Sequence, residues 1–320
     1  MTRFSIGEAL RAAFRLMRQR PAAVFVWGAL IIGPTLAFMP MMLATMSRFA
    51  ATMEAQSAAG IDPANAPFPA EAFAGLIGMQ LAFGLLNLLQ LFAMIVVYPA
   101  IMRAVIRPEE RSWFSMRVSM DEVRVTVVAA AILGGLYFIM MIAMMLVMVV
   151  GVFVIGAGGG EDGSGIVGGM MALVMLAIVV AVICILPRFS LMAPASLMKR
   201  RFGFTDGWQM AKGHWGQLIG LYLSIIGIIL LTELLLLVVG LAVVAVVVST
   251  GFGATWSNAG TSEMPFAALD AVWTTWWPLF ALGGVVLCAF YGALMTLSTA
   301  PLASACLQLS RQEEINSVTG

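Results

Sequence analysis

Six long apolar stretches restrict the fold of this chain more than any other feature of its sequence. A helix needs about 20 apolar residues to cross the ~30 Å hydrocarbon core of a bilayer. The stretches cover about residues 22–46, 73–103, 125–156, 166–198, 217–249 and 271–306. Several exceed the minimum length, which predicts tilted helices or helix ends that project beyond the lipid. We therefore predict an all-α, polytopic membrane helix bundle in which six transmembrane helices form a single membrane domain over residues 1–320.

The composition agrees with a protein whose solvent is lipid. Hydrophobic residues make up 62% of the chain and charged residues 10%, whereas about a quarter of the residues in a soluble domain are charged. The net charge of +1 gives no basic surface, so nucleic acid is not an expected partner. One histidine, His214, and three cysteines without a CxxC spacing predict neither a metal site nor a cofactor.

The Lys and Arg residues fall on one side of the predicted spans. They lie in the first 20 residues, at Arg103, in the loops at 104–124 and 199–216, and at Arg311; Arg188 lies near the same side, just inside the fourth span, whereas Arg48 alone lies on the opposite side. Because cytoplasmic loops carry the excess of Lys and Arg, we predict that both termini are cytoplasmic, with 311–320 as a short cytoplasmic tail. The predicted location is a bacterial inner (plasma) membrane.

Three predicted spans end in similar segments that contain proline. These segments read Tyr98-Pro99-Ala100, Ala193-Pro194-Ala195 and Ala300-Pro301-Leu302. Proline removes an i→i−4 hydrogen bond, so each is predicted to kink its helix near the inner interface. We predict three repeats, at about 1–105, 106–200 and 201–310, each made of an amphipathic lead-in helix and a transmembrane hairpin.

The lead-in helices are predicted from amphipathic segments. In the first, Phe4, Ala9, Ala13, Leu16 and Met17 share one stripe opposite Arg3, Arg11, Arg15 and Arg18. A second segment opens at Phe204, and a weaker third copy is predicted at 115–124. The first segment has the profile of a helix lying in the membrane surface. A cytoplasmic helix packed on its own protein explains the same pattern equally well.

Four polar residues within the spans form the candidate binding site. Glu233 lies at the centre of the fifth span, where an ionised carboxylate is costly unless it is paired or protonated. It is either a proton or substrate site with a raised pKa or a carboxyl that helps the helices to pack. Asn87 and Gln90 share a face of the second span and are plausible partners. Arg188 is predicted to snorkel to the headgroups, or alternatively to pair with Glu233.

The sequence contains no enzymatic constellation. It has no G-x-S-x-G elbow, P-loop or His-carboxylate cluster, so we predict no catalytic residues. The acidic pairs Glu109-Glu110 and Asp121-Glu122 lie in a short basic loop. We expect them to form solvated ion pairs there.

Three motifs resemble one bacterial family. RFSLMAPA at 188–195 precedes FTDGWQMAKGHW at 204–215, and FSIGEAL stands at 4–10. They are similar to the membrane domain found on some glycerophosphoryl diester phosphodiesterases, a family that includes stand-alone six-helix proteins of unknown function. Lys199-Arg200-Arg201 stands where the family often has an acidic residue. The resemblance implies a membrane domain without the hydrolase, because one histidine cannot supply the His pair of such a metal site.

Two functions follow from these patterns. The first is a non-catalytic integral membrane protein that handles, senses or transports a lipid or a small amphiphile, which the repeat, Glu233 and the surface helices favour. The alternative is a scaffold or assembly partner of another membrane protein, which the lack of a row of polar residues along the spans favours. Membrane lipids are the expected partners, with another membrane protein or a second copy of the chain as alternatives.

Overall fold

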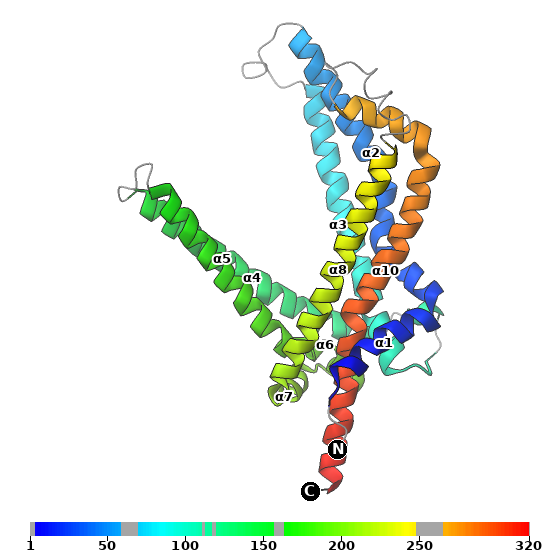
Figure 1. The fold of residues 1–320 in the computed structure, drawn as a ribbon, viewed down its shortest axis with the longest axis vertical. Coiled ribbons are helices and arrows are strands. Elements are labelled where there is room, and N and C mark those ends of the chain that lie inside the picture. The colour runs from blue at the N-terminus through cyan, green and yellow to red at the C-terminus, as the bar shows by residue number, and fades with distance from the viewer. Residues whose placement is uncertain are drawn as a thin grey trace. The chain divides into compact units, whose positions relative to one another are not determined.

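The computed structural model describes residues 4–58, 70–110, 113–116, 120–156, 163–247 and 265–319. No strand occurs among them, which confirms the all-α fold class. The helices (Figure 1) are α1 (Ile6–Gln19), α2 (Pro21–Ala58), α3 (Ala70–Ile106), the 3₁₀ turn η1 (Trp113–Ser115), α4 (Met120–Gly156), α5 (Gly163–Phe189), α6 (Met192–Lys199), α7 (Phe204–Lys212), α8 (Trp215–Val247) and α10 (Pro265–Thr319).

Six helical segments of the described chain are long and apolar enough to cross a membrane. They are Pro21–Phe49, Phe73–Ile106, Met120–Phe153, Ala172–Lys199, Trp215–Ala242 and Trp277–Ile315. Each coincides with one of the predicted stretches. Leu, Phe and Met side chains are exposed along much of their length, and an apolar surface of this extent is suited to lipid rather than to water. The chain is therefore a multi-pass membrane protein.

The chain forms two compact units, and each unit combines distant segments. Unit 1 comprises Met1–Leu16, Tyr98–Ile226 and Leu297–Gly320, and unit 2 comprises Met17–Val97 and Gly227–Thr296. The chain passes from one unit to the other inside α1, α3, α8 and α10. These units do not coincide with the three predicted repeats, and the repeats stay a prediction.

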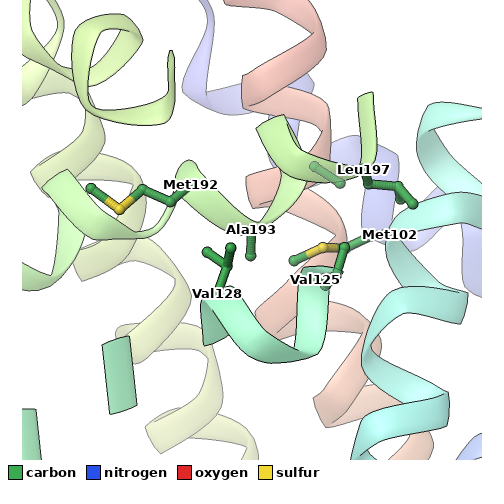
Figure 2. Packing of buried hydrophobic residues seen from close by; sticks show 7 residues of the cluster. Met102, Val125, Val128, Met192, Ala193 and Leu197 are labelled. Atoms are coloured by element: carbon green, nitrogen blue, oxygen red, sulfur yellow. The ribbon is translucent and has the colours of Figure 1, made fainter. Parts of the chain in front are cut away.

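The core of unit 1 is an apolar cluster where α3, α4, α6 and α10 meet. Figure 2 shows Met102 of α3 next to Val125 of α4, with Ala193 of α6 and Val128 of α4 in the centre and Met192 of α6 at the opposite side of the cluster. The small side chains of Ala193 on α6 and Ala303 on α10 belong to the same cluster. Small residues let helix backbones approach closely in lipid, where van der Waals packing drives association. This cluster fixes α6 beside the start of α4.

The fourth span breaks at Ser190–Leu191, between two prolines. Helix α5 ends at Phe189 and α6 begins at Met192. Pro187 lacks the N–H that would continue the α5 ladder, whereas Pro194 lies in the first turn of α6, where N–H groups have no intrahelical partner. The kink predicted at Pro194 is therefore a break that precedes it. Pro99 and Pro301 lie inside the continuous helices α3 and α10.

Two glycines allow α7 to pack closely on α6. The Gly203 N–H donates to Ser196 Oγ at 2.9 Å, and that hydroxyl donates to the Met192 carbonyl at 2.7 Å. A Cβ on Gly207 would lie 2.5 Å from Met192 Cα. Only glycine leaves room for this contact, so Gly207 sets the distance between the two short helices.

Helix α1 packs on unit 1 through an alanine stripe. Ala9, Ala12, Ala13 and Leu16 are buried, and the Ser5 N–H donates to Gln308 Oε1 of α10 at 3.0 Å. Helix α1 therefore packs on its own protein, and its location in the cytoplasm or at the membrane surface stays a prediction. Phe14 and the arginines at 11, 15 and 18 are exposed. The third lead-in copy does not form a separate helix in the described part of 115–124, because η1 ends at Ser115 and α4 begins at Met120.

In unit 2, α2 contacts both α3 and α10. The Phe38 and Phe83 rings meet edge to face, with their centroids 5.4 Å apart. A Cβ on Gly28 would overlap the carbonyl oxygen of Cys288, and one on Gly292 would overlap that of Val24. The backbones of α2 and α10 therefore touch at these glycines, as small residues permit in membrane helices.

Candidate functional site

An apolar groove lies between α4 and α5 in unit 1. These helices run side by side as a hairpin (Figure 1). The groove has a volume of about 220 Å³, and its walls are apolar side chains from Ala131 to Ala143 on α4 and from Ile178 to Phe189 on α5. Its surface therefore offers van der Waals contact and almost no hydrogen-bonding groups.

The groove has the length of one bilayer leaflet. Ala131 and Ala143 lie about 18 Å apart along α4, at 1.5 Å per residue, and half of the hydrocarbon core measures about 15 Å. Gly135 lines the groove, and a Cβ at this position would have no atom within 4 Å. The space beside Gly135 is open, and the groove is as apolar as a hydrocarbon chain.

Two indoles of unit 1 lie near one end of the groove, beside Phe189 and Arg188. The ring of Phe189, the last groove residue on α5, lies 5.7 Å from that of Trp208 on α7, centroid to centroid. Trp215 at the start of α8 is tied to α5, because its Nε1–H donates to the Cys184 carbonyl at 3.1 Å. Both indoles are partly exposed, as suits side chains that favour the headgroup level of a membrane.

Arg188 lies against both of these indoles. Its guanidinium carbon is 5.5 Å from the centroid of Trp208 and 5.1 Å from that of Trp215. The side chain is exposed, and no carboxylate of the described residues lies within 4.0 Å of it. Cation–π contacts hold a guanidinium without neutralising its charge. Its predicted pairing with Glu233 joins residues of different units and stays a prediction.

Arg103 and Glu122 form a buried ion pair between α3 and α4. Arg103 is 2% exposed and Glu122 5%, and Arg103 Nη2 donates to Glu122 Oε1. Arg103 Nε also lies 3.8 Å from Glu110 Oε2. The expectation that the acidic pair Asp121-Glu122 is solvated was therefore wrong for Glu122, because the Met102 cluster packs α3 against α4 beside it.

Arg107 extends this polar contact toward α6. Its Nη2 donates to the Leu197 carbonyl at 2.8 Å, and its Nη1 donates to Asp121 Oδ2 at 3.4 Å. A single guanidinium therefore joins the end of α3 to the end of α6 and the start of α4. None of these three residues lines the groove.

Asp206 holds the turn between α6 and α7. Its Oδ1 accepts from Lys199 Nζ and Arg201 Nη2, both at 2.8 Å, and its Oδ2 accepts from Arg201 Nε at 3.1 Å. The hydrogen bond from Lys199 is the largest cause that lowers the pKa of the Asp206 carboxyl; the bonds from Arg201 add to it, and partial burial opposes it. The ion pairs therefore join α7, the helix that carries Trp208, to the end of α6.

The predicted site residues of unit 2 are not joined by hydrogen bonds in the described structure. The Asn87 amide donates to the Phe83 carbonyl of its own helix at 2.8 Å. The Gln90 amide donates to the Ile31 carbonyl at 3.4 Å and to Thr35 Oγ1 at 3.3 Å, which joins α3 to α2. Glu233 lies on an exposed face of α8. A site formed by these residues with Arg188 stays a prediction.

Sequence reasoning found Arg188 and missed the two indoles that surround it. Trp208 and Trp215 stand seven residues apart on either side of the Gly213-His214 turn. These two tryptophans, in the first helices after the span that ends beside Arg188, are the signal available in the sequence. In the ranges that the structure describes, no group of three or more His, Cys, Asp or Glu side chains is placed to hold a metal ion.

No protein-family model, curated protein or solved structure matches the chain.

Proposed function

We propose that this protein binds a membrane lipid with one acyl chain in the α4–α5 groove, and that it handles or senses this lipid without changing it chemically. The proposal rests on one observation: the apolar groove is as long as one bilayer leaflet, and a cation lies at its end. The groove ends at Phe189, and the neighbouring residue Arg188 lies against two indoles. A phospholipid is complementary to this arrangement, because its apolar acyl chain is followed by a negatively charged phosphate.

The physics of lipid packing supports this occupant. The atoms that line an empty groove lack partners for dispersion contacts on one side. In a bilayer, a neighbouring acyl chain therefore fills the space. The hydrophobic effect does not favour this chain over other lipid, because bulk lipid is equally apolar. The shape beside Gly135 and the polar end at Arg188 must therefore supply any preference for one lipid over another.

The predicted orientation determines which leaflet of the membrane the groove lies in. Arg188, Lys199, Arg200 and Arg201 are at the end of the hairpin where the basic loops lie. If this end is cytoplasmic, as the cation distribution predicts, the lipid is drawn from the cytoplasmic leaflet. Protease protection of a tag placed at the C-terminus in sealed inverted vesicles tests this part of the proposal independently.

A photoactivatable phospholipid tests whether the groove is occupied. The purified protein in nanodiscs is irradiated with a phospholipid that carries a diazirine midway along one acyl chain, and adducts are mapped by peptide mass spectrometry. We expect adducts on α4 between Ala131 and Ala143. Gly135→Leu should reduce them severalfold because its side chain enters the groove. Gly134→Leu is the matched control, since a Cβ there also meets no atom within 4 Å and Gly134 does not line the groove.

An even distribution of adducts would contradict the proposal. If adducts are spread evenly over the exposed faces of all the spans, and Gly135→Leu and Gly134→Leu give the same map, the groove has no lipid site. Thermal unfolding of both variants in detergent shows whether either substitution has disturbed the fold.

Glu233 favours a second function, assembly with another membrane protein or a second copy. This carboxyl lies at the middle of α8 on an exposed face, and it has no hydrogen bond or ion pair with the residues that the structure describes. A polar partner on a second protein would offset the cost of exposing it to lipid. Crosslinking from a cysteine placed at Leu237, one turn away, tests this function in native membranes. No crosslinked species would argue against it.

A further inference from the structure

We propose that Arg188, with Trp208, Trp215 and Lys212, forms a headgroup site that selects phospholipids with net negative charge over zwitterionic ones. The inference rests on the proposed function, because the same lipid places its chain in the α4–α5 groove. It adds the chemical class of the ligand. All four residues belong to unit 1.

Arg188 differs from the cations at this end of unit 1 that form ion pairs. Arg103, Arg107, Arg124, Lys199, Arg200 and Arg201 each lie within ion-pair distance of a carboxylate. The contacts that the structure gives the Arg188 guanidinium are with two indole rings instead. Its positive charge is therefore held in place and left without a counter-ion from the described chain.

The two indoles leave the hydrogen-bonding edge of the guanidinium available. Cation–π contact uses the face of the aromatic ring, whereas the five N–H groups of arginine lie in the guanidinium plane. This fork geometry matches two oxygens of a phosphate. The Nε1–H bond from Trp215 to the Cys184 carbonyl fixes that indole on α5. The guanidinium is therefore presented ready to bind, which lowers the entropy cost of ordering it.

Lys212 supplies a second cation on the same side of α7 as Trp208. The two residues are four apart on one helix, so their side chains share a face. Lys212 is exposed and has no ion pair with the described residues. A lipid phosphate is therefore attracted by two charges, whereas the quaternary ammonium of a zwitterionic headgroup is repelled by both. The net effect is a preference for anionic headgroups.

Lipid competition measures this preference directly. The full-length protein is delipidated, then offered equal amounts of phosphatidylglycerol and phosphatidylcholine with identical chains, and the retained lipid is counted by native mass spectrometry. We expect wild type to retain phosphatidylglycerol in preference. Arg188→Gln and Lys212→Gln should each reduce the preference about fivefold, the ratio that corresponds to one cation near a membrane surface. Arg188→Lys should lie between wild type and Arg188→Gln.

Arg15→Gln is the matched control. Arg15 is an exposed arginine on α1, so this variant loses the same net charge away from the groove and should keep the wild-type preference. If Arg15→Gln lowers the preference as much as Arg188→Gln, the effect is one of overall charge and the headgroup site is disproved. Added glycerol phosphate should fail to displace the lipid; displacement at similar concentrations would assign the site to free phosphate and overturn the proposal.

The two proposals fail in different ways. Equal retention of both lipids together with acyl-chain adducts in the groove would overturn the headgroup selectivity and leave the groove as a lipid site. Loss of the groove adducts with both lipids would overturn the proposed function itself. Lys212 is fully on the surface of α7, so its substitution tests selectivity even if Arg188→Gln disturbs the packing of the two indoles.

Discussion

Arg103, near the end of α3, and Glu122, at the start of α4, form an ion pair that is almost wholly removed from contact with solvent. Arg103 is 2% exposed and Glu122 5%. Removing two charges from water is costly, and their attraction compensates for this only while both are present. The pair therefore specifies which ends of α3 and α4 meet, and each side chain depends on the other.

We expect Glu122→Ala to destabilise the protein by about 3 kcal/mol, because it leaves Arg103 buried without its closest counter-ion. The double variant Arg103→Met/Glu122→Leu should recover most of that loss. Glu110→Ala is the control, since Glu110 is 36% exposed and its pairs should be worth less than about 1 kcal/mol. Thermal unfolding in a single detergent measures all of them. Equal losses for Glu122→Ala and Glu110→Ala would contradict the burial argument.

The Asp206 contacts predict a pH-dependent stability. Its pKa in the folded protein is lowered below the ordinary value of 3.8, first by the hydrogen bond from Lys199. A lowered pKa means that the carboxylate stabilises the fold above the ordinary pKa and that this contribution disappears as the pH falls through the folded value. Since Arg201 is exposed, the contribution should be about 1 kcal/mol or less.

Melting temperatures of wild type and Asp206→Asn between pH 2 and pH 6 check this sign. The wild type should be more stable by a constant margin in the upper part of that range, and the margin should shrink below the ordinary pKa. Thr205→Ala, an exposed neighbour, should follow the wild type throughout. A margin that grows on acidification would reverse the assigned direction of the pKa shift.

The contact between α2 and α10 predicts opposite effects for similar substitutions. Gly28→Ala and Gly292→Ala each place a Cβ on a carbonyl oxygen of the facing helix, and overpacking of this kind costs about 1–3 kcal/mol. Gly33→Ala on α2 adds the same methyl where no atom lies within 4 Å. It should be neutral or stabilising by up to about 1 kcal/mol, because alanine has the higher helix propensity. Unfolding in detergent separates the two outcomes.

Glu233 provides a test that separates the two proposed functions. It does not line the α4–α5 groove, so Glu233→Gln should leave the acyl-chain adducts there unchanged. The same substitution replaces the carboxyl in the middle of α8 with an amide and should weaken any crosslink between copies that depends on that carboxyl. Loss of the groove adducts in Glu233→Gln would instead favour the predicted site of Glu233, Asn87, Gln90 and Arg188.

The six spans were predictable because hydropathy is a local property of the sequence. A run of about 20 apolar residues reports its own helix without reference to the rest of the fold. The position of the break near Ser190 was harder to predict from the two prolines, Pro187 and Pro194. A proline in the first turn of a helix does not break that helix, so the break depends on which of the two lies in a first turn. Pro194 does so only because α6 is a separate helix that packs on α3 and α4.

The groups around the groove depend on contacts between distant residues. Arg188 comes to lie against Trp208 and Trp215 because α7 returns to α5, and Gly207 permits the close packing of α7 on α6. Glu122 is buried rather than solvated because α3 and α4 pack together at Met102. Both outcomes require tertiary packing, and neither a charge count nor a helical period contains that information.

Helix α10 has a practical consequence for imaging this protein. It remains helical from Pro265 to Thr319. A helical partner protein fused in phase after Thr319 would continue the last turns of this helix. A chain of 34.1 kDa with little mass outside the lipid would then carry a rigid marker for aligning particle images. The proposed lipid could be sought directly in the resulting map.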